Sequence, residues 1–198
     1  MTALTQPNTT PDTQTLPKPH WEPGVEHLLS TLNPWLTQSW NTQLIPGAGE
    51  PLYLPADAQT PHNRIFFAHG YFNSALHELA HWCLAGERRR GLEDYGYWYC
   101  PDGRNAEQQA EFERVEVKPQ AIEWWLTLAC GRRFRTSLDN LSGEPTDSRP
   151  FRTRVQAQAI TYAEGGLPSR AESAVNLLSQ AFEQPRPTEA VFSEQIPS

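Results

Sequence analysis

The spacing of apolar residues predicts a mainly helical chain with a few short strands. Apolar positions recur every three or four residues from Val25 to Trp40, which is typical of an amphipathic helix, with Pro34 either bending it or starting a second helix. The same periodicity predicts a long helix over 106–130 and two further helices over 151–164 and 169–182. Gly165, Gly166 and Pro168 separate the last two helices.

The segment before the long helix carries the strand signals. Residues 64–68 (RIFFA) are typical of a short buried strand, and residues 42–56 alternate short apolar pieces with turn residues. A helix over 74–85 follows, with Asn73 or Ser74 expected as its N-cap and Gly86 as its terminator. Aromatic residues crowd into 94–103, where Pro-Asp-Gly at 101–103 predicts a turn.

Both ends of the chain differ from its middle. Residues 1–23 are rich in Thr, Pro and Gln and nearly lack aliphatic side chains, so burial cannot offset the entropy lost on ordering them. Residues 185–198 contain three prolines that interrupt any helix. We therefore expect a disordered arm over 1–23, one folded domain over 24–184 and a flexible tail over 185–198. We expect an α+β fold class, mainly helical with a few short strands.

Charge and hydropathy exclude some classes of protein. The 198 residues carry a formal net charge of −7, which argues against general affinity for nucleic acid or anionic membranes. No stretch approaches the roughly 18 apolar residues of a membrane helix, and the N-terminus lacks the features of a signal peptide. We expect a cytoplasmic protein without nucleic-acid or membrane partners.

The strongest chemical signal is an H-E-x-x-H motif within the helix over 74–85. It consists of His77, Glu78 and His81. Residues four apart lie about 40° apart around a helix and one turn along it, so both imidazoles can reach one metal ion from the same side. The motif therefore predicts a metal site, against the alternative of two histidines that only pack or cap.

A carboxylate normally completes such a site, and the long helix supplies two candidates. With about 100° per residue, Glu116 lies roughly 90° from the centre of the apolar stripe of that helix, and Glu113 roughly 150° away. Glu116 is therefore the expected third ligand, and Glu113 stays open as the alternative. Glu123, two turns further along, could accept a hydrogen bond from a ligand imidazole. His69, after the strand, could also approach the site, although a histidine there more often binds a backbone carbonyl.

A cationic run, Arg88 to Arg90, follows the metal-binding helix. It is either a solvated helix end, where the helix dipole favours positive charge, or a surface that steers an acidic protein partner toward the site. The sequence alone leaves both interpretations open.

The donor set of two histidines and one carboxylate fits two chemistries. One is a zinc peptidase in which Glu78 acts as general base on a metal-bound water. The other is a non-haem iron oxygenase, whose facial triad has the same donors. From the motif alone the peptidase is favoured, although a cytoplasmic protease without a pro-segment would need some control. A catalytically inactive binding module is a third reading.

Four ungapped sequence blocks, one of which contains the H-E-x-x-H motif, resemble a known family. They are residues 51–57 (PLYLPAD), 75–83 (ALHELAHWC), 95–104 (YGYWYCPDGR) and 115–121 (VEVKPQA). In this order they resemble the elongation factor P hydroxylase family over about residues 25–182. The arm and the tail lie outside that resemblance.

The resemblance implies a protein lysine hydroxylase of the monooxygenase type. Its substrate would be the β-lysylated lysine of translation elongation factor P, and its cofactor iron (Fe²⁺), with molecular oxygen as co-substrate. Carried over by position, the metal ligands are His77, His81 and Glu116. Glu78 is the expected catalytic residue, because its position next to His77 in the helix places it near the open side of the metal, where it would tune the site or shuttle protons. The sequence contains no recognisable flavin or nicotinamide site, so the reductant stays unidentified. The sequence also does not identify the metal bound in the cell, the oligomeric state or the residues that bind the protein substrate.

Overall fold

The computed structural model describes residues 14–96, 103–137, 147–194 and 197. Its helices and strands are α1 (Val25–Trp40), β1 (Thr42–Pro46), β2 (Leu52–Leu54), β3 (Asn63–Phe67), α2 (Phe72–Leu84), α3 (Glu87–Arg90), α4 (Ala106–Ala129), α5 (Arg149–Gly165), α6 (Ser169–Ala181) and α7 (Glu189–Glu194). The predicted α+β fold, mainly helical with a few strands, is confirmed. Within the described ranges, no helix has the length and apolar content that crossing a membrane requires.

The three strands form one small mixed sheet with β3 in the centre. β1 runs parallel to β3, and β2 runs antiparallel to it. The predicted buried strand is confirmed as β3, and the short apolar pieces before it are β1 and β2. Asn33 on α1 donates to and accepts from the backbone of Leu44 in β1, which fixes α1 along the sheet edge. Pro34 lies inside α1, which runs on through it as one helix.

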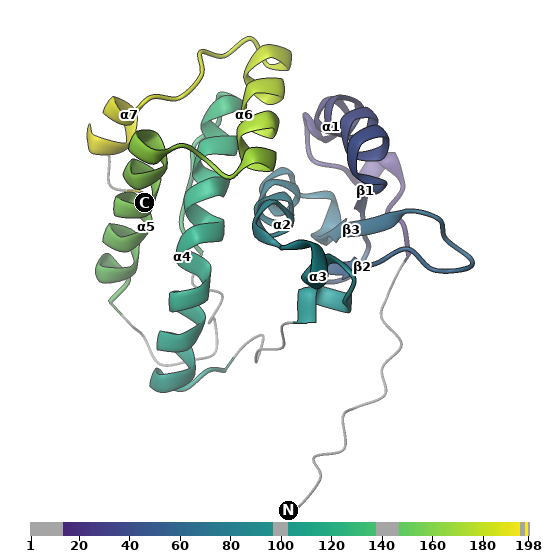
Figure 1. The fold of residues 1–198 in the computed structure, drawn as a ribbon, viewed down its shortest axis with the longest axis horizontal. Coiled ribbons are helices and arrows are strands. Elements are labelled where there is room, and N and C mark those ends of the chain that lie inside the picture. The colour runs from purple at the N-terminus through teal and green to yellow at the C-terminus, as the bar shows by residue number, and fades with distance from the viewer. Residues whose placement is uncertain (1–13, 97–102, 138–146, 195–196, 198) are drawn as a thin grey trace, which may run out of the picture.

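The helices form successive layers beside the sheet. α1 and α2 pack on the sheet, α4 packs against α2, and α5 and α6 pack against α4. Figure 1 shows α2 lying between the sheet and α4. Because α2 and α4 share this interface, residues on their facing sides meet in the middle of the domain.

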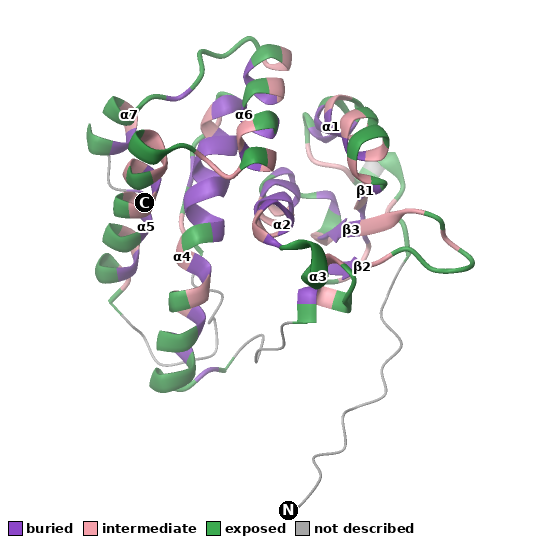
Figure 2. Cartoon of the chain, in the orientation of Figure 1, coloured by how far each residue is buried: buried purple, intermediate pink, exposed green. Residues whose placement is uncertain are grey.

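The predicted apolar stripe on α4 is too narrow for the C-terminal half of the helix. Residues 119–127 are buried on every side, and Figure 2 shows buried positions around the whole of this half. The reason is that α2, α5 and α6 all pack against α4. The N-terminal half matches a one-sided helix better, although Val115 in the predicted stripe is only half-buried.

Parts of both chain ends that we expected to be disordered belong to the packed structure. Leu16 donates its backbone N–H to Pro46 at 2.7 Å, and the Trp21 indole donates to the Leu16 carbonyl. At the other end, Phe192 of α7 is fully buried, and Gln156 donates to its carbonyl. Leu16 and Trp21 at one end are half-buried, and Pro187 and Phe192 at the other are buried, although the overall composition of the ends does not suggest it.

Candidate metal centre

α2 begins at a place that the sequence did not predict. Neither Asn73 nor Ser74 caps it, and the helix starts at Phe72. The Phe72 N–H donates to the Glu22 carboxylate at 2.8 Å, while Ser74 Oγ accepts from the Ala68 N–H. The helix ends at Leu84 with Ala85 as its C-cap, one residue before the expected terminator. A carboxylate from outside the helix therefore anchors the element that carries the histidine motif.

The structure brings His77, His81 and Glu116 together between α2 and α4. His81 Nε2 lies 3.1 Å from His77 Nε2 and 3.2 Å from Glu116 Oε1. His77 Nε2 lies 3.6 Å from Glu116 Oε2. Among the described residues, this is the cluster of His, Cys, Asp and Glu side chains whose ligand atoms converge closely enough to hold a metal ion.

These separations suit one ion at the centre of the cluster. Ligands about 2.1 Å from an ion, at angles between tetrahedral and octahedral, lie roughly 3.0–3.4 Å apart. The separations of 3.1 and 3.2 Å lie within that range, and the third, 3.6 Å, exceeds it by 0.2 Å. The donors are two imidazole nitrogens and a carboxylate oxygen, which fit Fe²⁺ and Zn²⁺ alike.

Glu123 orients the first of the two imidazoles. Its Oε2 lies 2.8 Å from His77 Nδ1, so that nitrogen donates its proton to the carboxylate. A neutral His77 then keeps its lone pair on Nε2, the nitrogen that faces His81 and Glu116. In the metal-free protein burial disfavours the charged imidazole, but the hydrogen bond to Glu123 and the charges of Glu123, Glu116 and Glu78 outweigh burial and raise the pKa of His77 well above its usual value. Binding of a metal ion at Nε2 would therefore release a proton from His77.

Glu116 is an anion despite its burial. Its exposed fraction is only 1%. Burial raises the pKa of a carboxyl group, but the imidazoles of His81 and His77 lower the pKa of Glu116 to about 2. Gln120, one turn further along α4, donates to Glu116 Oε2 at 3.5 Å and is itself held by two hydrogen bonds to the backbone of Ser137. Sequence reasoning missed Gln120, although its spacing of four residues from Glu116 places it on the same helix face.

The other expected ligand candidates lie elsewhere. Glu113 Oε2 forms an ion pair with Arg154 on α5 at 2.6 Å, so its carboxylate points away from the histidines. His69 is exposed beside Tyr71, with ring centroids 5.6 Å apart.

The aromatic residues that crowd into 94–103 are only partly described. Tyr95 is buried and stacks on Tyr53, with ring centroids 4.3 Å apart. The other aromatic residues, at 97–99, and most of the turn predicted after them lie outside the described residues.

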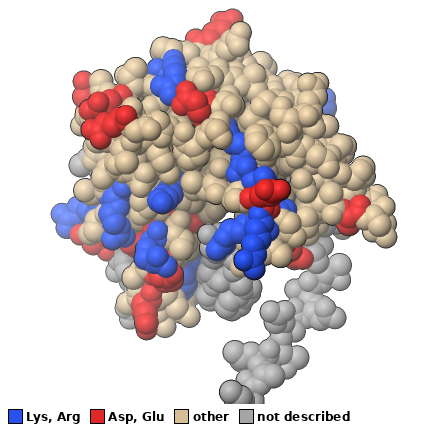
Figure 3. Space-filling model, viewed as in Figure 1, with Lys and Arg blue, Asp and Glu red and all other residues tan. Residues whose placement is uncertain are grey.

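A cleft of about 590 Å³ opens onto the cluster. Its lining includes His81, Glu116 and Tyr95 inside and three cationic residues, Arg88, Arg89 and Lys118. Figure 3 shows lysine and arginine side chains gathered beside a hollow in the surface. Glu78 lies close enough to His77 and His81 for direct charge interaction, and burial raises the pKa of its carboxyl group. A substrate large enough to fill the cleft could therefore reach an ion bound at this cluster.

Comparison with known proteins identifies the family of the chain. The family model for elongation factor P hydroxylase matches residues 31–192. The match thus continues into α7, beyond the end of the resemblance seen in the sequence. A protein of Haemophilus influenzae named elongation factor P lysine hydroxylase is 52% identical over 152 residues, which cover 77% of this chain and 85% of that protein. The chain belongs to the elongation factor P hydroxylase family.

Proposed function

We propose that this protein hydroxylates the β-lysylated lysine of elongation factor P, using a non-haem iron ion held by His77, His81 and Glu116. The observation that carries the proposal is the convergence of these three donors, 3.1–3.6 Å apart, at the end of an open cleft. Family membership supports the substrate, since the relative's name states that it acts on a lysine of elongation factor P. A translation factor as substrate would place the reaction in the cytoplasm.

When bound, Fe²⁺ supplies the reductive activation of O₂: one oxygen atom enters a C–H bond, and the other leaves as water with two electrons from a reductant. The protein's own side chains prepare for this chemistry. Glu123 keeps the proton of His77 on Nδ1, Glu116 brings a negative charge, and Gln120 holds the Glu116 carboxylate. We assign Glu78 to proton transfer, because it directly follows His77 in α2 and its carboxyl group interacts electrostatically with both imidazoles.

A zinc peptidase would use the same donors, with Glu78 as a hydrolytic base. The family match over residues 31–192 favours hydroxylation, because it extends far beyond the H-E-x-x-H motif that the two chemistries share. The two functions differ in their products: hydroxylation adds one oxygen atom to an intact polypeptide, whereas hydrolysis breaks the polypeptide.

The test is the mass of elongation factor P after incubation with the iron-loaded protein, O₂ and a chemical reductant. We expect the β-lysylated form to gain one oxygen atom, located on the modified lysine by fragmentation. Unmodified elongation factor P is the matched substrate control, and zinc-loaded protein is the matched metal control. Cleavage of an unstructured peptide by the zinc form, lost in Glu78→Gln, would contradict the proposal and restore the peptidase.

A further inference from the structure

Seven of the 16 lysine and arginine residues form ion pairs with described carboxylates. In the described part of the chain, such ion pairs involve Lys18, Arg64, Arg114, Arg132, Arg149, Arg154 and Arg186. Arg88, Lys118, Arg133 and Arg135 are exposed and form no ion pair with a described acidic residue. Of these four, two line the cleft, Arg88 from α3 and Lys118 from α4. Two cations from separate elements thus lie unpaired at the entrance to the metal centre.

The structure divides the cationic run after α2 into different roles. Arg90 donates to the Ala85 carbonyl at 2.7 Å, and Arg89 donates to the Tyr95 carbonyl at 3.2 Å. Their side chains are therefore occupied within the fold, which leaves Arg88 as the member of the run able to reach a partner. The prediction that all three arginines form a docking surface therefore includes two residues, Arg89 and Arg90, that bind backbone carbonyls instead.

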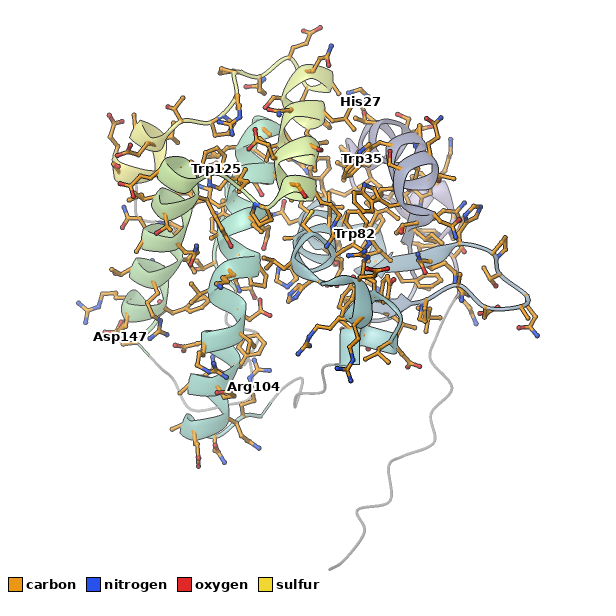
Figure 4. The ribbon with its side chains drawn as sticks, in the orientation of Figure 1. His27, Trp35, Trp82, Arg104, Trp125 and Asp147 are labelled. Carbon is orange, nitrogen blue, oxygen red and sulfur yellow. The ribbon has the colours of Figure 1, made fainter. Side chains whose placement is uncertain are left out.

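Further positive charge is fixed behind the entrance. Arg170 of α6 donates to the Trp82 and Cys83 carbonyls at 3.0 Å, and its guanidinium lies 4.8 Å from the centre of a Trp82 ring. Figure 4 shows Trp82 on α2, on the side that faces Trp35 of α1. Arg170 and Arg90 add to the positive potential near the cleft, although neither is available to a partner. Glu87 is the acidic residue that also lines the cleft near Arg88.

A lysine-derived side chain is cationic, so Arg88 and Lys118 at the entrance repel it. The entrance becomes favourable only if the surface around the modified lysine brings carboxylates to Arg88 and Lys118.

We infer that Arg88 and Lys118 form a docking rim for an acidic polypeptide surface next to the substrate lysine. The inference rests on the proposed function and extends it, because it assigns recognition of the protein partner to two residues outside the metal centre. The rim selects the protein that carries the lysine, and the cleft then admits the modified side chain.

The experiment measures binding of β-lysylated elongation factor P to the iron-loaded protein without O₂, so that no turnover occurs. The double variant Arg88→Ser/Lys118→Ser should bind about tenfold more weakly at 0.1 M salt. The difference should nearly vanish at 1 M salt, where the screening length falls from about 10 Å to about 3 Å. Arg88→Lys/Lys118→Arg, which keeps both charges, should bind like the wild type.

The matched control is Arg133→Ser/Arg135→Ser, which removes two exposed positive charges that do not line the cleft. It should bind like the wild type, and iron content and thermal unfolding should be unchanged in every variant. Equal binding by the Arg88/Lys118 variant and the wild type at 0.1 M salt would overturn the inference. So would an equal loss in the control, or equally tight binding of duplex DNA through the same two residues. Absence of hydroxylation by the wild type would instead count against the proposed function, which this binding measurement does not use.

Discussion

At the scale of single residues, three buried polar side chains on α4 support the proposed metal centre. Glu116, Gln120 and Glu123 follow one another at spacings of four and three residues, and all are buried. Glu116 faces the ligand nitrogens, Gln120 holds Glu116, and Glu123 holds His77. Buried carboxylates are costly unless they are paired, so the three side chains are stable there because each has a partner.

Glu123→Gln tests this support. The amide keeps the shape of the side chain but removes the charge that fixes the proton on His77 Nδ1, so Fe²⁺ affinity should fall roughly tenfold. Competition with a chromogenic chelator, without oxygen, measures that affinity. Glu113→Gln is the control, since it removes the same charge from the same helix at a residue that pairs with Arg154. Equal affinities in the two variants would show that Glu123 has no effect on the ion.

At the scale of elements, the start of α2 illustrates where sequence reasoning fails. Asn73 and Ser74 are good N-cap residues by type, and local preference alone selects them. The helix instead begins earlier, because Glu22, fifty residues upstream, supplies the acceptor for the Phe72 N–H. A capping residue fifty positions away in the chain cannot be recognised from the local sequence of the helix.

Glu22→Ala should therefore destabilise the domain by about 1–2 kcal/mol, because it leaves the Phe72 N–H without its acceptor and breaks the ion pair with Arg132. Urea unfolding followed by circular dichroism measures the change. Glu26→Ala is a suitable control, since the ion pair of Glu26 with Lys18 is exposed to solvent. If both variants lost the same stability, the carboxylate of Glu22 would not be capping α2.

At the scale of the whole molecule, the sequence predicted elements better than their packing. Helical periodicity identified α1, α4, α5 and α6, and a short apolar run identified β3. These patterns did not predict the pairing of the strands, the burial of α4 on all sides or the ordered parts of the ends. These features depend on contacts between residues far apart in the chain, which a local pattern does not encode.

The candidate site shows the same division. The spacing of His77 and His81 predicted two donors on one helix face, and the helical wheel favoured Glu116 over Glu113. The structure places Glu116 beside both imidazoles and Glu113 beside Arg154. The role of Gln120 was missed, because a glutamine on a buried helix face has no chemical signature until its neighbours are known.

Phe192→Ala tests whether α7 belongs to the domain. Phe192 is fully buried, with its ring 5.0 Å from Trp124 and 4.5 Å from Trp125. Truncation leaves a cavity among aromatic side chains, so we expect a loss of about 3–5 kcal/mol in the free energy of unfolding. Val191→Ala, at a half-buried neighbour, is the control and should cost less. Similar stability of Phe192→Ala and the wild type would mean that the tail is dispensable.

The central claim is that His77, His81 and Glu116 hold the ion on which the reaction depends. Its most direct test is an anaerobic Fe²⁺ titration of the wild type, Glu116→Gln and Glu113→Gln under identical conditions. We expect the wild type and Glu113→Gln to bind one ion per chain with equal affinity, and Glu116→Gln to bind at least about tenfold more weakly. Full affinity in Glu116→Gln together with a loss in Glu113→Gln would contradict the account.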